Sequence, residues 1–458
     1  MKKRTNSMLE GNAVKSIILF ALPIMASSML QYNYSVVDNI IVGRYVSNEA
    51  LAAVGSVGSI NSFIIGTALG LTSGFTIPVA HAFGADDKKR ASRLAGNSIS
   101  LAFLIGTLIA VVAHLLSTPL LKLIGTPDEI IDLSASYVNI LYYGVPFQML
   151  SNNFTAISRS VGESKKPLYF FSVTVVLNFF LDLLFVRVCG FGVEGAAAAT
   201  LISHITAATL NGIYVLKFNR KISIRKDDLI PDIKISLKQV SLGIPVSLQF
   251  TMTSVGSMCL QSVVNSFGTP VIAGFTAAGR VEGITNIPMS GLGVATQTFV
   301  GQNYGAKNYK RITDGVKKIF ILDIAVSVFM STALYVMGEP IVSLFMEEFD
   351  PAIMVAAKRY ILAIAQCYSL VAVLFVMRNT LQGLGFTFAN TVAGVGEFFG
   401  RLSVAFIFTP LLGFSAVCYA GPAAWLLADI PLIIIYLHKH RQFKKLTAES
   451  TNQKKVSV

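Results

Sequence analysis

The chain has 458 residues, of which 53% are hydrophobic and only 13% are charged, and its formal net charge is +13. An ordinary soluble domain carries roughly 25% charged residues, so a soluble globule of this size would lack the polar side chains to cover its surface. This composition excludes a secreted disulfide scaffold, a disordered chain and a cytosolic enzyme, and it predicts a membrane protein.

Apolar runs that end at Gly, Pro or clusters of charge mark the predicted membrane helices. One crossing takes about 20 mostly apolar residues, and the chain has twelve such runs. In chain order they cover residues 14–41, 50–82, 94–117, 133–158, 168–187, 193–216, 239–265, 271–301, 316–337, 355–381, 388–409 and 415–437. The predicted fold class is an all-α polytopic membrane protein with twelve transmembrane helices.

Spans one, five and six carry polar residues that stand out from their apolar surroundings. Asp38 lies near the outer end of span one, and Thr200 lies in span six. Asn178 and Asp182 lie one turn apart in span five, so they share a helix face. A rise of about 1.5 Å per residue places all of them at a similar depth. An ionisable group inside hydrocarbon costs about 2.5 to 3.5 kcal/mol, so the presence of Asp38 and Asp182 in membrane spans requires an explanation.

Two carboxylates, an amide and a hydroxyl at one depth suit either a proton or a hard cation. Neighbouring carboxylates titrate as a pair, and oxygen ligands of this kind suit Na⁺ by the logic that governs other hard cations. The set Asp38, Asn178, Asp182 and Thr200 is therefore a predicted site for H⁺ or Na⁺. The alternative is that each acid satisfies polar groups of a neighbouring helix.

The second half begins after a polar segment of mixed charge, residues 217–238, which is predicted to be a cytoplasmic linker. Span eight contains Glu282, which either ties helices together with a nearby arginine or contacts a cationic substrate. Glu397 lies one turn before Arg401 in span eleven, and this spacing predicts an internal ion pair. Residues 438–458 form a basic tail, predicted to be cytoplasmic.

An internal repeat becomes visible when the chain is shifted by about 222 residues. Pro23 then meets Pro245, and Tyr137 meets Tyr360. Six spans per half is an even number, so the two copies point the same way through the membrane. We expect an N-lobe of residues 1–216 and a C-lobe of residues 239–437, enclosing a central cleft. Candidate residues lining this cleft are Gln31, Tyr34, Met252, Glu282 and Met289.

Most of the 37 basic residues fall in the two termini and in the loops on the same side of the membrane. The positive-inside rule then places both termini of this multi-pass protein in the cytoplasm. The excess positive charge orients the chain in the membrane and is attracted to anionic lipid headgroups. Nucleic acid is therefore not an expected partner.

The sequence has no convincing catalytic or nucleotide-binding motif. Residues 190–195 match G-x-G-x-x-G, but they lie at a turn between two membrane spans, outside any βαβ unit. The chain has no P-loop motif and no H-E-x-x-H motif. We therefore expect neither an enzyme nor a bound cofactor.

Several segments, taken in order, resemble the bacterial type of the multidrug and toxic compound extrusion family. They are Val37-Asp38-Asn39-Ile40-Ile41-Val42-Gly43, Ala50-Leu51-Ala52-Ala53-Val54-Gly55, residues 78–84, residues 159–167 and residues 291–306. The resemblance covers residues 10–440 and implies a multi-pass protein of the bacterial cytoplasmic (inner) membrane. It implies that Asp38, Asn178, Asp182 and Thr200 form the cation site, and that Pro23 is the proline at which the first helix bends. Some branches carry acids in spans seven and ten, where this chain has Thr253 and Val371.

The resemblance implies an efflux antiporter that exports organic, often cationic and amphipathic compounds in exchange for H⁺ or Na⁺ by alternating access. Its expected partners are small-molecule substrates and membrane lipids, and the expected state is a monomer. One alternative is a lipid-linked oligosaccharide flippase of the same superfamily, although the chain has few membrane arginines to hold a pyrophosphate: Arg280, Arg378 and Arg401. A membrane-embedded enzyme is a further alternative, but no nucleophile and base are found together.

Overall fold

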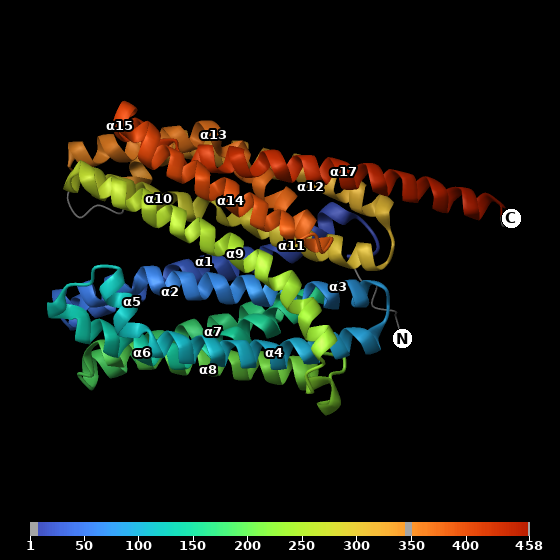
Figure 1. Ribbon diagram of the computed structural model, residues 1–458, viewed down its shortest axis with the longest axis horizontal. Helices are drawn as coiled ribbons and strands as arrows, with labels where there is room; N and C mark the ends of the chain where they lie inside the picture. Colours follow the sequence, from blue (N-terminus) through green and yellow to red (C-terminus); the bar gives the residue numbers. More distant parts are fainter. Residues whose placement is uncertain (1–7, 344–349, 457–458) are drawn as a thin grey trace. The chain divides into compact units, whose positions relative to one another are not determined.

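The computed structural model of the chain is almost entirely helical (Figure 1). The structure describes the backbone of residues 8–343 and 350–456, and their side chains except those of residues 35–40, 48, 51, 59 and 448–456. This part of the chain contains no strand. Each predicted span corresponds to one helix or to consecutive helices, so the all-α membrane fold class is confirmed.

Nine helical segments within the described residues are long and apolar enough to cross a membrane. The remaining predicted spans correspond to α6 (Asp128–Ser160), to α9 (Ile233–Val264) and to the pair α10 (Thr269–Thr285) and α11 (Ile287–Gly305). These helices contain buried polar side chains such as Asn153, Gln249 and Thr296, which lower their mean hydropathy. The prediction of twelve spans is consistent with this helix pattern.

Contacts divide the chain into two compact units. Unit 1 consists of residues 1–25 and 248–458, and unit 2 consists of residues 26–247. The predicted lobes, residues 1–216 and 239–437, differ from these units at the start of α1 (Ala13–Tyr45) and at the start of α9. Each of these helices contributes its first part to one unit and its second part to the other.

Close packing at two glycines of α2 explains why the first part of α9 belongs to unit 2. Gly70 and Gly74 lie on α2, and a Cβ atom on either would collide with the backbone of α9 at Ser247 and Gly243 respectively. Because both positions lack a side chain, the two helix backbones approach closely. Residues 233–247 therefore pack as part of unit 2.

Unit 2 is organised around α6, which packs against α2, α4 and α8 (Figure 1). Buried apolar side chains of α6, including Tyr137 and Val145, form the centre of this unit. Its helices, besides parts of α1 and α9, are α2 (Asn48–Phe75), α3 (Ile77–Gly84), α4 (Lys88–Leu115), α5 (Ser117–Leu123), α6, α7 (Lys165–Asp182) with a π-helical segment Leu183–Val188, α8 (Gly192–Ile213) with a π-helical segment Tyr214–Phe218, and a 3₁₀ turn Lys226–Leu229.

The segment predicted to be a linker, residues 217–238, is packed onto unit 2. The ammonium group of Lys221 donates hydrogen bonds to the carbonyls of Val161 and Gly162, each at 2.9 Å, just past the end of α6. The Asp232 backbone N–H donates to Oδ1 of Asn97 at 2.7 Å. The Asp232 carboxylate accepts from the first backbone N–H groups of α9, and the bond from Ile235 contributes most to holding the pKa of this carboxyl below its ordinary value.

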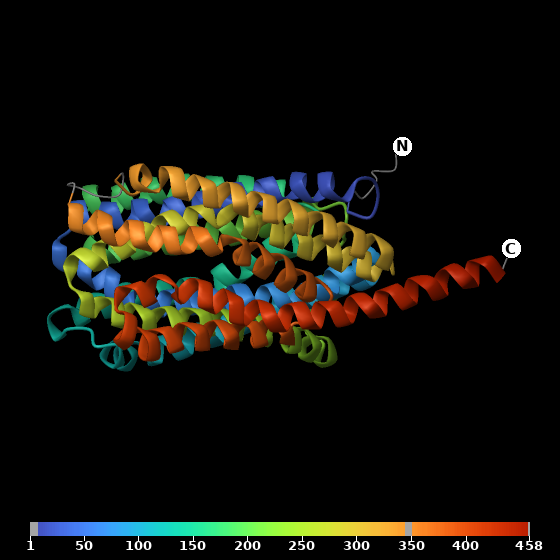
Figure 2. The same cartoon turned by 90° about the horizontal axis from the view of Figure 1, so that it is seen from above.

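Unit 1 is organised around α13 (Pro351–Gly383), which packs against α10, α11, α12 and α17. Its other helices are α12 (Tyr309–Ser343), α14 (Phe388–Ser403) with a π-helical segment Val404–Phe408, α15 (Thr409–Leu412), α16 (Phe414–Cys418) and α17 (Ala420–Val456), with a 3₁₀ turn Asn265–Phe267 after α9. Helices α6 and α13 are both 33 residues long, and each is the fourth span of its half. The end of α17 extends beyond the other helices of its unit (Figure 2).

Candidate functional site

Two of the predicted cation-site residues lie on the last turns of α7. Asn178 and Asp182 are one turn apart and are 2% and 1% exposed. The amide nitrogen of Asn178 has no hydrogen-bond partner among the described residues. The helix changes to π-helical geometry immediately after Asp182, and π-helical segments inside helices are frequent at functional sites.

The third residue, Thr200, lies on α8, which packs against α7. Its side chain is 9% exposed, and its hydroxyl lies 3.3 Å from the hydroxyl of Tyr34 on α1. This hydrogen bond brings α1 and α8 together within unit 2. Tyr34 was predicted as a residue of the substrate cleft, so its bond to Thr200 places a cleft candidate against a cation-site candidate.

The fourth residue, Asp38, belongs to α1, but its side chain lies outside the described residues. Its backbone lies one turn after Tyr34 in the same helix. Pro23 lies earlier in α1, inside a continuous helix, where its missing N–H removes a backbone hydrogen bond.

The remaining cleft candidates have different surroundings. Gln31 is exposed, and Met252 and Glu282 are half-buried. Met289 is 0% exposed and belongs to the apolar core of unit 1. Its side chain therefore packs in the core in this structure, and its place in the cleft stays a prediction.

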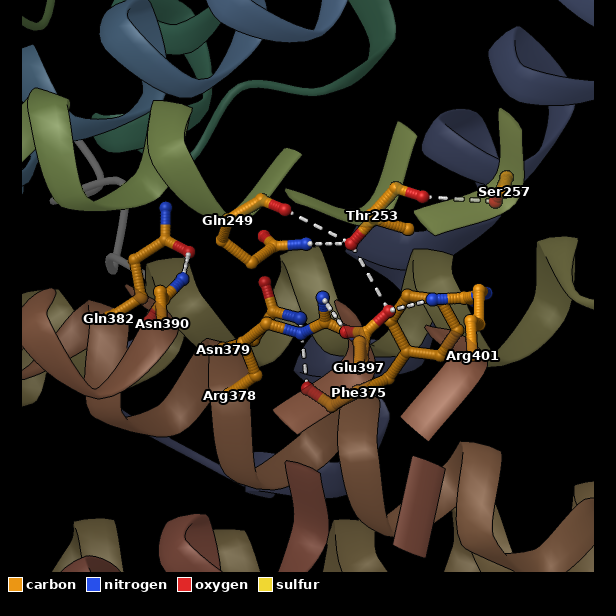
Figure 3. A network of polar contacts seen from close by, with 10 residues as sticks. All are labelled: Gln249, Thr253, Ser257, Phe375, Arg378, Asn379, Gln382, Asn390, Glu397 and Arg401. Atoms are coloured by element: carbon orange, nitrogen blue, oxygen red, sulfur yellow. Dashed lines mark hydrogen bonds and ion pairs between the residues drawn. The ribbon is translucent and has the colours of Figure 1, made fainter. Parts of the chain in front are cut away.

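Unit 1 contains a buried cluster of charge around Glu397 on α14 (Figure 3). The predicted ion pair with Arg401 is confirmed, with a distance of 3.4 Å from Arg401 Nη1 to Glu397 Oε2. A second arginine, Arg378 on α13, lies closer, with its Nη1 at 3.2 Å from Oε1. Thr253 on α9 donates its hydroxyl to Oε2 at 3.1 Å. Because Glu397 is only 3% exposed, all these contacts are shielded from water.

Asp429 on α17 lies in the same electrostatic neighbourhood. It is 2% exposed, and neither of its carboxylate oxygens accepts a hydrogen bond from a described residue. The charges of both Arg378 and Glu397 act on it. Arg378 pairs with Glu397 and acts on Asp429 only at longer range, which helical spacing does not reveal because the three residues lie on three helices.

Glu282 on α10 is held by neutral donors. Tyr360 of α13 donates its hydroxyl to Oε2 at 2.9 Å, and the amide of Asn286 lies 3.5 Å from Oε1. Within the described residues Glu282 has no ion pair within 4 Å, although the charge of Arg401 acts on it. The sequence does not predict the hydrogen bond from Tyr360 to Glu282, because a tyrosine in an apolar helix ordinarily indicates packing.

The family model for MatE matches the chain twice, over residues 23–184 and 245–407. The chain belongs to the MatE family. The two matches are offset by about 222 residues, so the internal repeat is confirmed. MatE proteins are transporters, so this MatE chain is a multi-pass membrane transporter and not an enzyme.

Similar proteins extend over almost the whole chain. The probable multidrug resistance protein YoeA of Bacillus subtilis (strain 168) is 28% identical over 443 residues, which cover 94% of each chain. The probable multidrug resistance protein YpnP of the same organism is 28% identical and covers 96% of this chain and 98% of its own. A solved outward-facing multidrug resistance MATE transporter of the MOP superfamily has the same fold, with a TM-score of 0.89 at 23% identity, over 97% of this chain and 100% of the other.

Proposed function

We propose that this MatE protein is a multidrug efflux antiporter. It exports organic, often cationic and amphipathic compounds in exchange for H⁺ or Na⁺, by alternating access between the predicted lobes, residues 1–216 and 239–437. The names of YoeA and YpnP support the class of cargo. The observation that carries the proposal is the buried polar set of unit 2, which consists of Asn178, Asp182 and Thr200.

The chemistry of this set favours cation binding. A buried carboxylate needs a proton, a cation or strong hydrogen bonds to offset the loss of water. Asp182 offers a carboxylate, Thr200 a hydroxyl and Asn178 an amide, and these are oxygen donors suited to a hard cation. Asp38 on α1 would supply the second carboxylate. H⁺ and Na⁺ are therefore the two coupling ions that the site can take, and no further cofactor is required.

Coupling to cargo follows from the position of α1. The second part of α1 meets α8 through Tyr34 and Thr200, and its first part contains Pro23. A cation that binds at the predicted site, whose residues lie on α1, α7 and α8, would alter the balance between a straight and a bent α1. A ligand shifts such an equilibrium only by its difference in affinity for the two states, so removal of the carboxylate should remove the shift.

The test uses proteoliposomes with an H⁺ gradient or a Na⁺ gradient imposed separately. We expect one of the two gradients to drive exchange of a fluorescent organic cation, and Asp182→Asn to reduce this exchange at least about tenfold. Asp323→Asn is the matched control, because Asp323 is a 0% exposed carboxyl of α12 in unit 1, whereas Asp182 belongs to unit 2. It should retain gradient-driven exchange.

Asp38→Asn provides a second test in whole cells that express the protein. Efflux of the fluorescent cation should fall to the level of cells without the transporter. Wild-type efflux by Asp38→Asn would contradict the assignment of the coupling site. Failure of both gradients to drive exchange by the unmodified protein would overturn the antiport mechanism itself.

A further inference from the structure

A cavity of about 550 Å³ lies at the start of α12 in unit 1. One of its walls is formed by residues 9–13, which lead into α1, and the other by residues of α12 and the turn before it. Ligand pockets commonly measure about 300 to 1,000 Å³, so this cavity is large enough for a small molecule or a lipid headgroup. Its lining residues differ from all those predicted for the cation site and the substrate cleft.

The wall of residues 9–13 is fastened to α12 by Arg311. Its Nη1 donates to the carbonyl of Gly11 at 2.7 Å, and its Nη2 donates to the carbonyl of Glu10 at 2.9 Å. The carbonyl of the buried Met8 accepts from Nε of Arg311 at 3.3 Å and from the amide of Asn303 at 2.9 Å. All these acceptors are neutral, so they fix the wall without cancelling the positive charge of Arg311.

Positive charge prevails in the cavity. Its cationic side chains are Lys310, Arg311 and Lys318, and its acidic side chains are Glu10 and Asp314. Asp314 lies one turn from each lysine, a spacing that permits ion pairs. Within the described part of the chain, however, none of these charged groups has an ion pair within 4 Å. The lysine ammonium groups are therefore free to meet a ligand, and phosphate oxygens are acceptors that suit them.

An exposed apolar stripe continues from the cavity along α12. Ile321 lies two turns after Asp314. Val328 and Tyr335 follow at the same interval, so all these residues share one helix face. The three side chains of the stripe, Ile321, Val328 and Tyr335, are 59%, 51% and 71% exposed. Because α12 is long and apolar enough to cross a membrane, apolar side chains this exposed are suited to contact with lipid acyl chains.

Aromatic side chains place the cavity at the depth of the lipid headgroups. Tyr309, the first residue of α12, stacks on Phe443 of α17 with ring centroids 5.2 Å apart. Tyr304, near the end of α11, lies 6.2 Å from Tyr309 by the same measure. Tyrosines near the ends of membrane helices are enriched at the membrane–water interface. The positive-inside rule predicts that this interface is the cytoplasmic one, where anionic lipids attract basic residues.

We propose that the cavity binds the headgroup of an anionic phospholipid, and that an acyl chain of this lipid lies along the stripe of α12. The lipid phosphate accepts hydrogen bonds from Lys310 and Lys318, while Arg311 positions the wall of residues 9–13. Asp314 opposes the negative headgroup and limits its affinity. A soluble phosphate ester fits the cavity but makes no use of the stripe. A zwitterionic lipid gains less from the excess of positive charge.

The experiment measures lipid binding to the purified, delipidated full-length protein by native mass spectrometry. The probes are phosphatidylglycerol and phosphatidylcholine with identical acyl chains, and glycerophosphoglycerol, which is the anionic headgroup without chains. We expect the wild-type protein to bind phosphatidylglycerol on the order of tenfold more tightly than phosphatidylcholine, because the lysines attract the anion. Glycerophosphoglycerol should bind on the order of tenfold more weakly than phosphatidylglycerol, because it buries no apolar surface.

Substitutions then locate the site. The double variant Lys310→Gln with Lys318→Gln should bind phosphatidylglycerol on the order of tenfold more weakly than the wild type and leave phosphatidylcholine binding unchanged. The double variant Lys444→Gln with Lys445→Gln is the matched control, because it removes the same charge from exposed positions of α17 outside the cavity. Asp314→Asn should bind phosphatidylglycerol about fivefold more tightly, a gain that a misfolded protein would not produce.

Unchanged phosphatidylglycerol binding in the Lys310 and Lys318 double variant, or an equal loss in the control, would overturn the inference. Equal affinity for phosphatidylglycerol and phosphatidylcholine, or no gain in Asp314→Asn, would also contradict it. Glycerophosphoglycerol binding as tight as that of the lipid would assign the cavity to a soluble phosphate ester and refute a lipid site. Because these measurements involve no transport, they are independent of the proposed antiport.

Discussion

Individual residues of unit 1 show how buried charge is tolerated in this protein. Glu397 accepts contacts from two arginines and one hydroxyl, and these come from three different helices. Burying a charge is costly, and a buried pair contributes to stability only when its remaining donors and acceptors are satisfied. The cluster is therefore sensitive to the loss of any one member.

Removal of the acid at position 397 is expected to destabilise the protein strongly. Glu397→Gln leaves Arg378 and Arg401 without their ion-pair partner, and the loss of one partner of a buried pair costs about 3 to 5 kcal/mol. The measurement is the melting temperature of the purified protein in detergent. Glu339→Gln is the control, because Glu339 and Lys358 form an exposed pair, and exposed pairs contribute about 0 to 1 kcal/mol. Equal melting temperatures for the two variants would refute this account of the cluster.

At the scale of elements, the repeat places buried charge on equivalent helices. Asn178 and Asp182 lie on α7 in unit 2, and Glu397 and Arg401 lie on α14 in unit 1. Both helices are the fifth span of their half, and both pass into a π-helical segment at their end. The residues themselves differ, so a common helix architecture supports a carboxylate and an amide in one unit and an ion pair in the other.

Helix packing in unit 2 depends on glycine at the contact between α2 and α9. We expect Gly74→Ala to destabilise the protein by about 1 to 3 kcal/mol, because the new methyl group meets the backbone of Gly243. The control on the same helix is Gly55→Ala, where a Cβ atom meets nothing within 4 Å. That variant should be neutral or more stable by up to about 1 kcal/mol, because alanine favours helix over glycine. The unfolding temperatures of both variants and the wild type are compared by size-exclusion chromatography after heating. A Gly74→Ala protein as stable as the wild type would show that the contact between α2 and α9 is not tight.

For the whole molecule, the distribution of charge predicts the orientation in the membrane. Basic residues gather in the N-terminal segment, in the loops on the same side and in the tail from Lys439 onward. The positive-inside rule then places Cys189, in the turn between α7 and α8, on the outer side. Cys189 is exposed, whereas Cys418 is buried.

Native cysteine labelling tests this orientation. A membrane-impermeant maleimide added to intact cells should label the wild-type protein, and Cys189→Ser should remove the label. In the Cys189→Ser background, Gln442→Cys should be labelled only after the membrane is permeabilised, because the positive-inside rule predicts a cytoplasmic tail. Labelling of Gln442→Cys in intact cells would invert the proposed topology.

The sequence by itself determined the membrane class, the order of the spans, the internal repeat and the residues that share one helix face. It placed Asn178 beside Asp182 and Glu397 beside Arg401, because an α-helix has about 3.6 residues per turn and residues four positions apart lie on the same face. Only the tertiary structure decided that Arg378 pairs with Glu397, that Tyr360 donates a hydrogen bond to Glu282, and that α1 and α9 each contribute to both units. Helical periodicity shows which residues share one face of a helix, but the partner of each residue on a neighbouring helix depends on how the helices pack.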